Sequence, residues 1–190
     1  MKTIVFLLEE PSAAVMLKEL IQANFFINPE KLSLRYVVYE GKQDLEKNLE
    51  RAIRHWQIPE TSFFVMRDQD AGDCKTIKER LRSKCLNAGR SDVIIRIACH
   101  ELESFYLGDL AAVEKGLELK GIARRQQNKK YREPDNLSNP SGVLEELTKK
   151  QYQKIDGSRR ITRNMNPEHN QSHSFNVLYG SLREMMRGML

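Results

Sequence analysis

Short apolar segments alternate with amphipathic ones along the first half of the chain. The apolar segments are rich in strand-forming residues and predict four buried β-strands, over residues 2–8, 32–39, 63–66 and 91–98. The segments between them repeat apolar residues every three or four positions, as one-faced helices do. These predicted helices begin at Ser12 and span residues 42–57 and 71–86. The alternation of strand and helix favours an α/β fold with a mostly parallel four-stranded sheet flanked by helices.

After His100 the pattern changes to helices separated by irregular polar segments. The helices predicted in this half span residues 101–107, 110–118, 141–150 and 175–189. The stretch 156–174 is rich in Gly, Ser, Asn and His and is predicted to be a loop. A chain of 190 residues suits one compact domain. We therefore expect an α/β core over residues 1–109 and a helical, basic C-terminal extension over residues 110–190, packed on the same domain.

The charge pattern adds a basic surface to this second half. The chain has 31 Lys and Arg against 26 Asp and Glu, a formal net charge of +5. Residues 119–132 contain no acid and six basic residues, which are Lys120, Arg124, Arg125, Lys129, Lys130 and Arg132. A second basic cluster lies in residues 157–165. Such clusters can neutralise phosphates, so nucleic acid is a candidate partner, and a solvated basic surface is the alternative.

Several classes of protein find no support in the sequence. No window approaches the roughly 18 apolar residues needed to span a bilayer, and the first thirty residues lack the pattern of a secretory signal. We therefore expect a cytoplasmic protein that does not contact membranes. Three cysteines without C-x-x-C spacing argue against a disulfide framework or a zinc knuckle. Without a glycine-rich phosphate loop, nucleotide hydrolysis and dinucleotide binding are poorly supported.

Acidic residues follow each of the four predicted strands. In open α/β sheets the carboxyl ends of the strands meet at the edge where ligands bind. The acids at these ends are Glu9, Glu10, Glu40, Asp68, Asp70, Asp73, Glu101 and Glu103. Carboxylates gathered in one place repel each other unless cations lie among them, and Mg²⁺ or Mn²⁺ prefers such hard oxygen ligands. The pattern therefore predicts a metal site at this edge.

The spacing of the acids suggests roles, and each has a simpler alternative. Asp68 and Asp70 would face the same side of an extended backbone and could share one ion, while a glutamate after the first strand could hold a second ion or act as general acid and base. Asp70 and Asp73 also suit the start of the helix that follows them. Glu101 and Glu103 could equally form the exposed first turn of an amphipathic helix.

Three histidines are weaker candidates. His100 lies beside the acids and could contact a metal ion or a phosphate, or it could occupy the surface. His169 and His173 could approach the same edge from the C-terminal part of the chain, and an ordinary polar loop is the alternative.

Three segments together resemble a known family. They read IVFLLEEPSAAVMLKEL, FFVMRDQDAGDCKTIKERL and IRIACHELESFYLGD, and they resemble the Toprim fold of topoisomerases, primases and OLD-type nucleases. More closely, they look like a bacterial and archaeal Toprim-like family of unknown function that is often encoded beside AAA or ABC-type ATPases. The resemblance covers roughly residues 1–109.

The resemblance implies roles for particular residues. The positions that match the acidic motifs of the family are Glu9, Asp68, Asp70, Glu101 and Glu103. Glu9 would be general acid and base or a ligand, and the others metal ligands, with Glu103 favoured over Glu101. The sequence departs from the family at Glu10, where glycine is usual, and at Ala13, where an acid is common.

The resemblance implies Mg²⁺- or Mn²⁺-dependent phosphodiester chemistry on DNA or RNA, by a nuclease or nuclease-like effector that acts with an ATPase partner, with phage defence as the expected context. The alternative is a non-catalytic Toprim-like subunit that binds an ATPase or nucleic acid. A phosphatase with Asp68 as nucleophile and Asp70 as acid is a third interpretation, although that chemistry usually places its D-x-D after the first strand.

Overall fold

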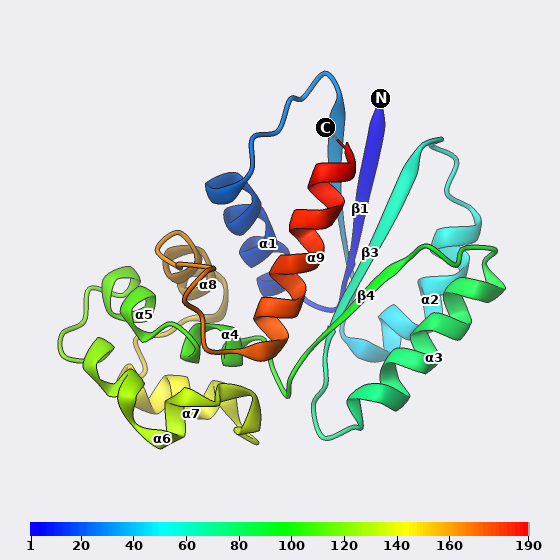
Figure 1. Ribbon diagram of the computed structural model, residues 1–190. Coiled ribbons are helices and arrows are strands. Elements are labelled where there is room, and N and C mark those ends of the chain that lie inside the picture. The colour runs from blue at the N-terminus through cyan, green and yellow to red at the C-terminus, as the bar shows by residue number, and fades with distance from the viewer. Residues whose placement is uncertain (190) are drawn as a thin grey trace.

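The computed structural model describes residues 1–189. Its centre is a four-stranded, all-parallel sheet with the strand order β2-β1-β3-β4 (Figure 1). The strands are β1 (Lys2–Leu8), β2 (Leu32–Val38), β3 (Thr61–Asp68) and β4 (Ile94–Ala98). This confirms the predicted α/β fold with a parallel sheet flanked by helices, an architecture consistent with the Rossmann-like class.

Four helices cover the two faces of the sheet. These are α1 (Pro11–Asn24), α2 (Lys42–Arg54), α3 (Cys74–Asn87) and α9 (His173–Met189). Figure 1 shows α1 and α9 on one face and α2 and α3 on the other. The side chains of β1 point alternately to the two faces, so that Ile4, Phe6 and Leu8 join the core under α1 and α9 while Val5 and Leu7 join the core under α2 and α3. Both faces are apolar, which is why the strands read as continuous apolar runs.

Helices α2 and α3 have different boundaries from those predicted, and the structure shows why. Helix α2 ends at Arg54, and Trp56 beyond it packs edge-on against Phe63 with ring centroids 5.9 Å apart. Helix α3 begins at Cys74 rather than near residue 71, because the carboxylate of Asp73 accepts a hydrogen bond from the N–H of Thr76 at 2.8 Å and caps the helix. The structure thus confirms the helix-start interpretation of Asp73.

The chain after β4 forms a lobe of short helices beside the carboxyl ends of the strands (Figure 1). Its elements are α4 (Glu103–Leu107), α5 (Leu110–Gly116), the 3₁₀ turns η1 (Ala123–Gln127) and η2 (Pro134–Asn136), α6 (Lys129–Arg132), α7 (Pro140–Leu147) and α8 (Lys154–Thr162). The apolar residues of this lobe belong to the same continuous core as those under α1 and α9. Helix α8 packs along α1, which joins the lobe to the sheet.

The loop predicted over residues 156–174 is wrong for its first part, which is helix α8. Gly157 contributes to that prediction, yet it lies inside helix α8. A larger residue would not fit there, because a Cβ at this position would lie 2.4 Å from Cδ2 in the ring of Tyr152. Gly116 shows the same effect at the crossing of α5 and α8, where a Cβ would lie 2.7 Å from the carbonyl oxygen of Arg160. These glycines permit close packing of helices and do not mark breaks in the chain.

Candidate functional site

The ends of β1 and β3 place the first two acids in contact. The two strands run parallel with Leu8 opposite Met66, so Glu9, which follows β1, reaches Asp68 at the end of β3. The backbone N–H of Asp68 donates a hydrogen bond to Oε2 of Glu9 at 3.0 Å. The carboxylate of Glu9 is therefore fixed to the strand that carries Asp68.

Four acids make up what we call the acidic cluster: Glu9, Glu10, Asp68 and Glu103. Asp68 is 9% exposed and Glu103 is fully buried, although both carry ionisable groups. The carboxyl of Asp68 lies within electrostatic range of Glu10, Glu9 and Glu103. Three of the four, Glu9, Asp68 and Glu103, are predicted site residues, and Glu10 is the fourth acid near Asp68.

Burial and mutual repulsion disfavour the charged forms of these acids. Burial raises the pKa of Asp68 well above its usual range, and the charges of Glu10, Glu9 and Glu103 raise it further. Burial also raises the pKa of Glu9, against the lowering effect of its hydrogen bond from the Asp68 backbone and of Arg67. The pKa of Glu103 is raised by burial too, while Lys154 and Tyr152 act in the opposite direction. For all three acids, burial is the largest cause of the raised pKa, and the nearby positive charges do not cancel it.

Glu103 has one oxygen without a protein partner. The hydroxyl of Tyr152 donates a hydrogen bond to Oε1 of Glu103 at 2.9 Å. Its other oxygen, Oε2, is buried and has no hydrogen-bond partner among residues 1–189. Because buried polar atoms are nearly always paired, an unpaired carboxylate oxygen beside other acids indicates a place for a cation, a proton or a water molecule.

Lys154 is a member of the site that the sequence does not reveal. Its Nζ lies 2.8 Å from Oε2 of Glu10, and it comes from the start of α8 in the helical lobe. Burial lowers the pKa of Lys154, but its pairing with Glu10 and the charges of Glu103 and Asp68 outweigh burial and raise that pKa. No sequence pattern around Lys154 links it to the acids, so only the tertiary structure identifies Lys154 as part of the site.

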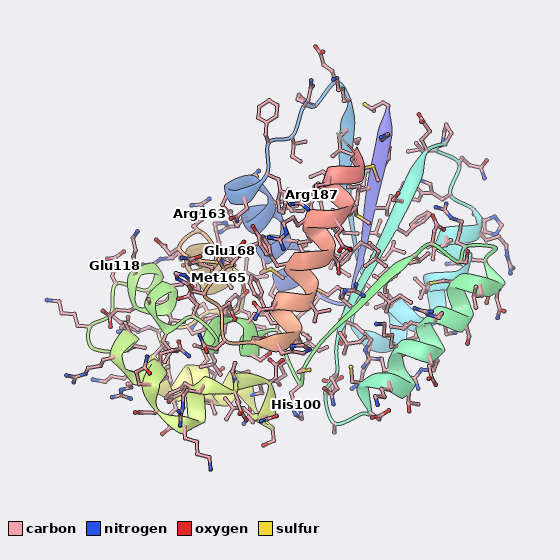
Figure 2. The ribbon with its side chains drawn as sticks, viewed as in Figure 1. His100, Glu118, Arg163, Met165, Glu168 and Arg187 are labelled. Carbon is pink, nitrogen blue, oxygen red and sulfur yellow. The ribbon has the colours of Figure 1, made fainter. Side chains whose placement is uncertain are left out.

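Asp70 contacts different partners from Asp68. Its Oδ2 lies 2.8 Å from Nζ of Lys42 and 3.3 Å from Nη2 of Arg67. The backbone of Asp70 is left-handed, with φ of 54°, so the extended geometry that would align it with Asp68 is absent. His100 stabilises this turn, since its carbonyl accepts the N–H of Asp70 at 2.8 Å and its Nδ1 lies 3.1 Å from the Asp70 carbonyl oxygen. Figure 2 shows His100 at the carboxyl end of the sheet.

Arg67 joins Asp70 to the acidic cluster. This side chain is 3% exposed, and its Nε donates to the backbone carbonyl of Asp68 at 2.7 Å. The same Nε lies 3.7 Å from Oε2 of Glu9, while the two terminal nitrogens contact Glu46 and Asp70. A buried guanidinium that touches several carboxylates fixes their positions, because a buried charge is tolerated only when it is paired. The segment MRDQD does not single out Arg67 in the sequence.

The remaining predicted site residues have other contacts. Oε2 of Glu101 accepts the backbone N–H of Ser141 at 2.8 Å, near the start of α7. Nδ1 of His169 lies 3.2 Å from the side-chain amide of Asn166, and His173 begins α9. None of these contacts involves the acidic cluster.

The acidic cluster has the chemistry of a divalent-cation site without its geometry. Among residues 1–189, no three His, Cys, Asp or Glu side chains gather so that they could hold a metal ion as they stand. The donors are nevertheless of the right kind, since Glu9, Asp68 and Glu103 supply hard oxygens and one of those oxygens is unpaired. We conclude that these three residues fit a hard cation chemically, and that binding requires their side chains to turn toward one another.

The two basic clusters differ in their ion pairs. The six basic residues of segment 119–132 are all exposed, and none forms an ion pair within the described part of the chain. In the second cluster, Arg163 pairs with Glu19 at 2.7 Å and Arg160 pairs with Glu118 at 2.8 Å. Figure 2 labels Glu118 and Arg163 on this side of the lobe. Only the first cluster, which we call the basic segment, therefore keeps its charge unpaired.

The raised carboxyl pKa values predict an unusual dependence of stability on pH. For Glu9, Asp68 and Glu103 the folded pKa lies above the unfolded pKa, so their stabilising contribution is complete below about pH 4 and is lost as the pH rises through the folded pKa. We expect the midpoint of urea unfolding, followed by fluorescence of the single tryptophan, to be higher at pH 5 than at pH 8. Asp92 and Glu114 have lowered pKa values and reverse the trend only in stronger acid. A midpoint that rises from pH 5 to pH 8 would contradict the burial of the cluster.

The parallel sheet and the acids at its carboxyl edge define an α/β protein with a candidate site where such folds bind ligands. Residues 8–183 match the family described as a domain of unknown function, DUF4276, and the chain belongs to this family. No curated protein and no solved structure matches the chain. Within residues 1–189, none of the helices has the length and apolar character needed to cross a membrane.

Proposed function

We propose that this protein performs metal-dependent phosphodiester chemistry on nucleic acid, as a Toprim-type nuclease or nuclease-like effector. The observation that carries the proposal is the acidic cluster at the carboxyl edge of a parallel sheet, in which the buried Asp68 lies within electrostatic range of both Glu9 and Glu103. The resemblance of the segments around these acids to Toprim and OLD-type proteins supports the same chemistry. The unpaired charge of the basic segment supports nucleic acid as the substrate.

Each member of the site has a role in this proposal. Glu9, Asp68 and Glu103 would hold Mg²⁺ or Mn²⁺, which when bound polarises the phosphoryl oxygen and activates water. As the alternative to metal binding, Glu9 would act as general acid and base, with its carboxylate oriented by the N–H of Asp68. Lys154 limits the repulsion among the acids and offers a positive charge for a phosphate oxygen.

An ATPase of the AAA or ABC type is part of the proposal as a partner. It rests only on the resemblance to Toprim-like proteins encoded beside such ATPases. Co-purification of the full-length protein with the product of a neighbouring ATPase gene would test it directly.

The second candidate function is a non-catalytic subunit that binds nucleic acid or an ATPase. One observation favours it: no three potential ligands converge among residues 1–189, and Lys154 and Arg67 already place positive charge beside the acids. In that case the acids and their ion pairs would serve folding alone. The departures at Glu10 and Ala13 from the usual Toprim pattern point the same way.

Metal binding and cleavage separate the two functions. We expect the wild-type protein to bind Mn²⁺ or Mg²⁺ in calorimetric titrations at millimolar concentrations or below, and to cleave labelled DNA or RNA only when the metal is present. The double variant Asp68→Ala/Asp70→Ala should lose cleavage. Glu79→Ala, at an exposed acid of α3 outside the site, is the matched control and should retain it.

Circular dichroism should show that both variants remain folded. Unchanged cleavage by the double variant would refute the proposed mechanism. A wild-type protein that binds neither metal at millimolar concentrations would favour the non-catalytic function.

A further inference from the structure

The two edge strands of the sheet differ in whether other parts of the protein cover them. β4 forms one edge and β2 the other. At β4, backbone groups that point away from β3 are bonded to side chains. The carbonyl oxygen of Ile95 accepts a hydrogen bond from Nη1 of Arg96 at 2.7 Å, and just beyond the strand the N–H of Cys99 donates to Oγ of Ser174 at 3.3 Å. Proteins often cover an edge strand in this way, which prevents it from pairing with another chain.

The outer edge of β2 has no such cover. In its ladder with β1, the N–H of Lys2 donates to the carbonyl of Lys31, and the N–H of Tyr39 donates to the carbonyl of Leu8. These two bonds fix the alternation, so odd-numbered residues of β2 bond to β1 and even-numbered residues turn their N–H and C=O groups outward. The residues of β2 whose outward groups have no hydrogen-bond partner among residues 1–189 are Leu34, Tyr36 and Val38.

The side chains of β2 also suit pairing with another strand. Its seven residues, LSLRYVV, include one charged side chain and no proline. Leu34 and Tyr36 are partly buried against the core under α1, and Val38 is 39% exposed. On the other face, Val37 packs against the core under α2 and Arg35 is exposed. An apolar edge strand with unsatisfied backbone groups is a template for a further strand.

Hydrogen bonding and charge together limit how a second copy of β2 can pair with the first. Two copies related by a twofold axis run antiparallel, and their outward groups bond only if even-numbered residues lie opposite even-numbered ones. An axis at Arg35 would place this arginine opposite itself, which like charges oppose. An axis at Leu34 would use the N–H of Leu32, which already donates to the carbonyl of Asn28 at 3.0 Å. Neither register suits the strand.

An axis at Tyr36 avoids both problems and joins charges that have no partner within one copy. It places Arg35 opposite Val37 of the second copy, next to Tyr39 on the same face. Within the described part of the chain, neither Arg35 nor Asp44 forms an ion pair. Asp44 and Tyr39 line one open cavity of about 550 Å³ beside α2. Because long side chains reach diagonal neighbours in a sheet, Arg35 of one copy can pair with Asp44 of the other.

We propose that this protein forms a homodimer through β2, in which the two β2 strands pair about a twofold axis at Tyr36 and Arg35 of each copy pairs with Asp44 of the other. The two four-stranded sheets then form one continuous sheet. Because the axis reverses the strand direction, the two acidic clusters lie at opposite ends of the joined sheet. Each copy keeps its own candidate site, and the dimer does not depend on the proposed function.

The mass of the full chain in solution tests the dimer. By sedimentation equilibrium at micromolar concentrations, we expect the wild-type protein to have twice the 22.1 kDa mass of one chain. Val38→Pro removes an outward N–H from each copy and leaves the bonds between β2 and β1 in place, so it should give a monomer.

Charge reversal tests the register. Arg35→Glu and Asp44→Arg each place like charges together across the interface, so each should raise the dissociation constant of the dimer by about tenfold or more. The double variant Arg35→Glu/Asp44→Arg restores opposite charges and should return the constant to within about threefold of the wild type. Arg82→Glu, at an exposed arginine of α3 beside the opposite edge strand β4, is the matched control and should dimerise like the wild type.

The possible outcomes decide the inference without metal or nucleic acid, so they are independent of the proposed function. Circular dichroism should show that the charge-reversal variants remain folded, and these variants decide the matter if Val38→Pro does not fold. A wild-type protein that stays monomeric at high micromolar concentration contradicts the dimer. A dimer that Arg35→Glu leaves unchanged, or that Arg82→Glu weakens equally, is not formed through β2. A double variant that fails to recover shows that Arg35 and Asp44 do not pair and that the register is wrong.

Discussion

Asp68→Asn is expected to make the protein more stable and inactive at the same time. Asp68 is a buried carboxyl whose charged form is opposed by burial and by Glu10, Glu9 and Glu103. An asparagine has nearly the same shape and no charge, so it removes this repulsion. We expect the midpoint of thermal unfolding at pH 8 to rise by about 3 to 6 °C, which corresponds to about 1 to 2 kcal/mol for a chain of this length.

The same substitution should remove most of the proposed activity. A metal ion contributes several kcal/mol of transition-state stabilisation, and each 1.4 kcal/mol or so is a factor of about ten in rate. Loss of one carboxylate ligand should therefore lower kcat for metal-dependent cleavage by about 10³-fold and weaken Mn²⁺ binding in calorimetry. A residue that only supported the fold would give the reverse pair of results, lower stability with activity scaled to the folded fraction.

The pH dependence provides an internal control for this prediction. At pH 5 a larger fraction of Asp68 is protonated in the folded wild-type protein, so the stability gain of Asp68→Asn should shrink relative to pH 8. Asp92→Asn is a suitable comparison, because Arg90 bonded to its side chain lowers the pKa of Asp92. That variant should lose stability at pH 8. A loss of stability for Asp68→Asn at pH 8 would show that the charge of Asp68 does not destabilise the folded protein.

The strands and the first three helices were predictable because each is decided by local pattern. A continuous apolar run marks β1, and apolar residues at helical spacing mark α2, whatever surrounds them. Helix α8 was not predictable in the same way. Its Gly157 has a low helix propensity, and the reason for that glycine is the ring of Tyr152 packed against it, which is a tertiary contact.

The candidate site was predictable where it depends on topology and unpredictable where it depends on side-chain direction. Parallel strands bring their carboxyl ends to one edge, so the strand assignment placed Glu9 and Asp68 there, while their contact depends on β1 lying next to β3. The prediction that Asp70 aligns with Asp68 assumed an extended backbone, whereas Asp70 adopts a left-handed turn supported by His100. Lys154 lies 144 residues from its partner Glu10, and no short motif encodes such a pair.

Replacement of the basic segment should have the second large effect, on nucleic-acid affinity. Its six exposed cations form no ion pairs within residues 1–189, so each is available to a phosphate. With all six replaced by Ala, we expect affinity for DNA or RNA near physiological salt to fall by about 10³-fold. The slope of log affinity against log salt should become shallower by about 4 to 5, since each phosphate that is no longer neutralised accounts for roughly 0.7 to 0.9.

The second basic cluster offers a matched control of similar chemistry. Arg159, Arg160 and Arg163 lie at α8 but pair with Glu19, Asp156 or Glu118, so their charge is already partly neutralised. Replacing these three by Ala should change affinity by no more than about threefold. If this triple variant lost as much affinity per residue as the six-residue variant, binding would follow overall charge and the basic segment would not be the interface. Equal salt slopes for the wild type and the six-residue variant would exclude the basic segment from phosphate binding altogether.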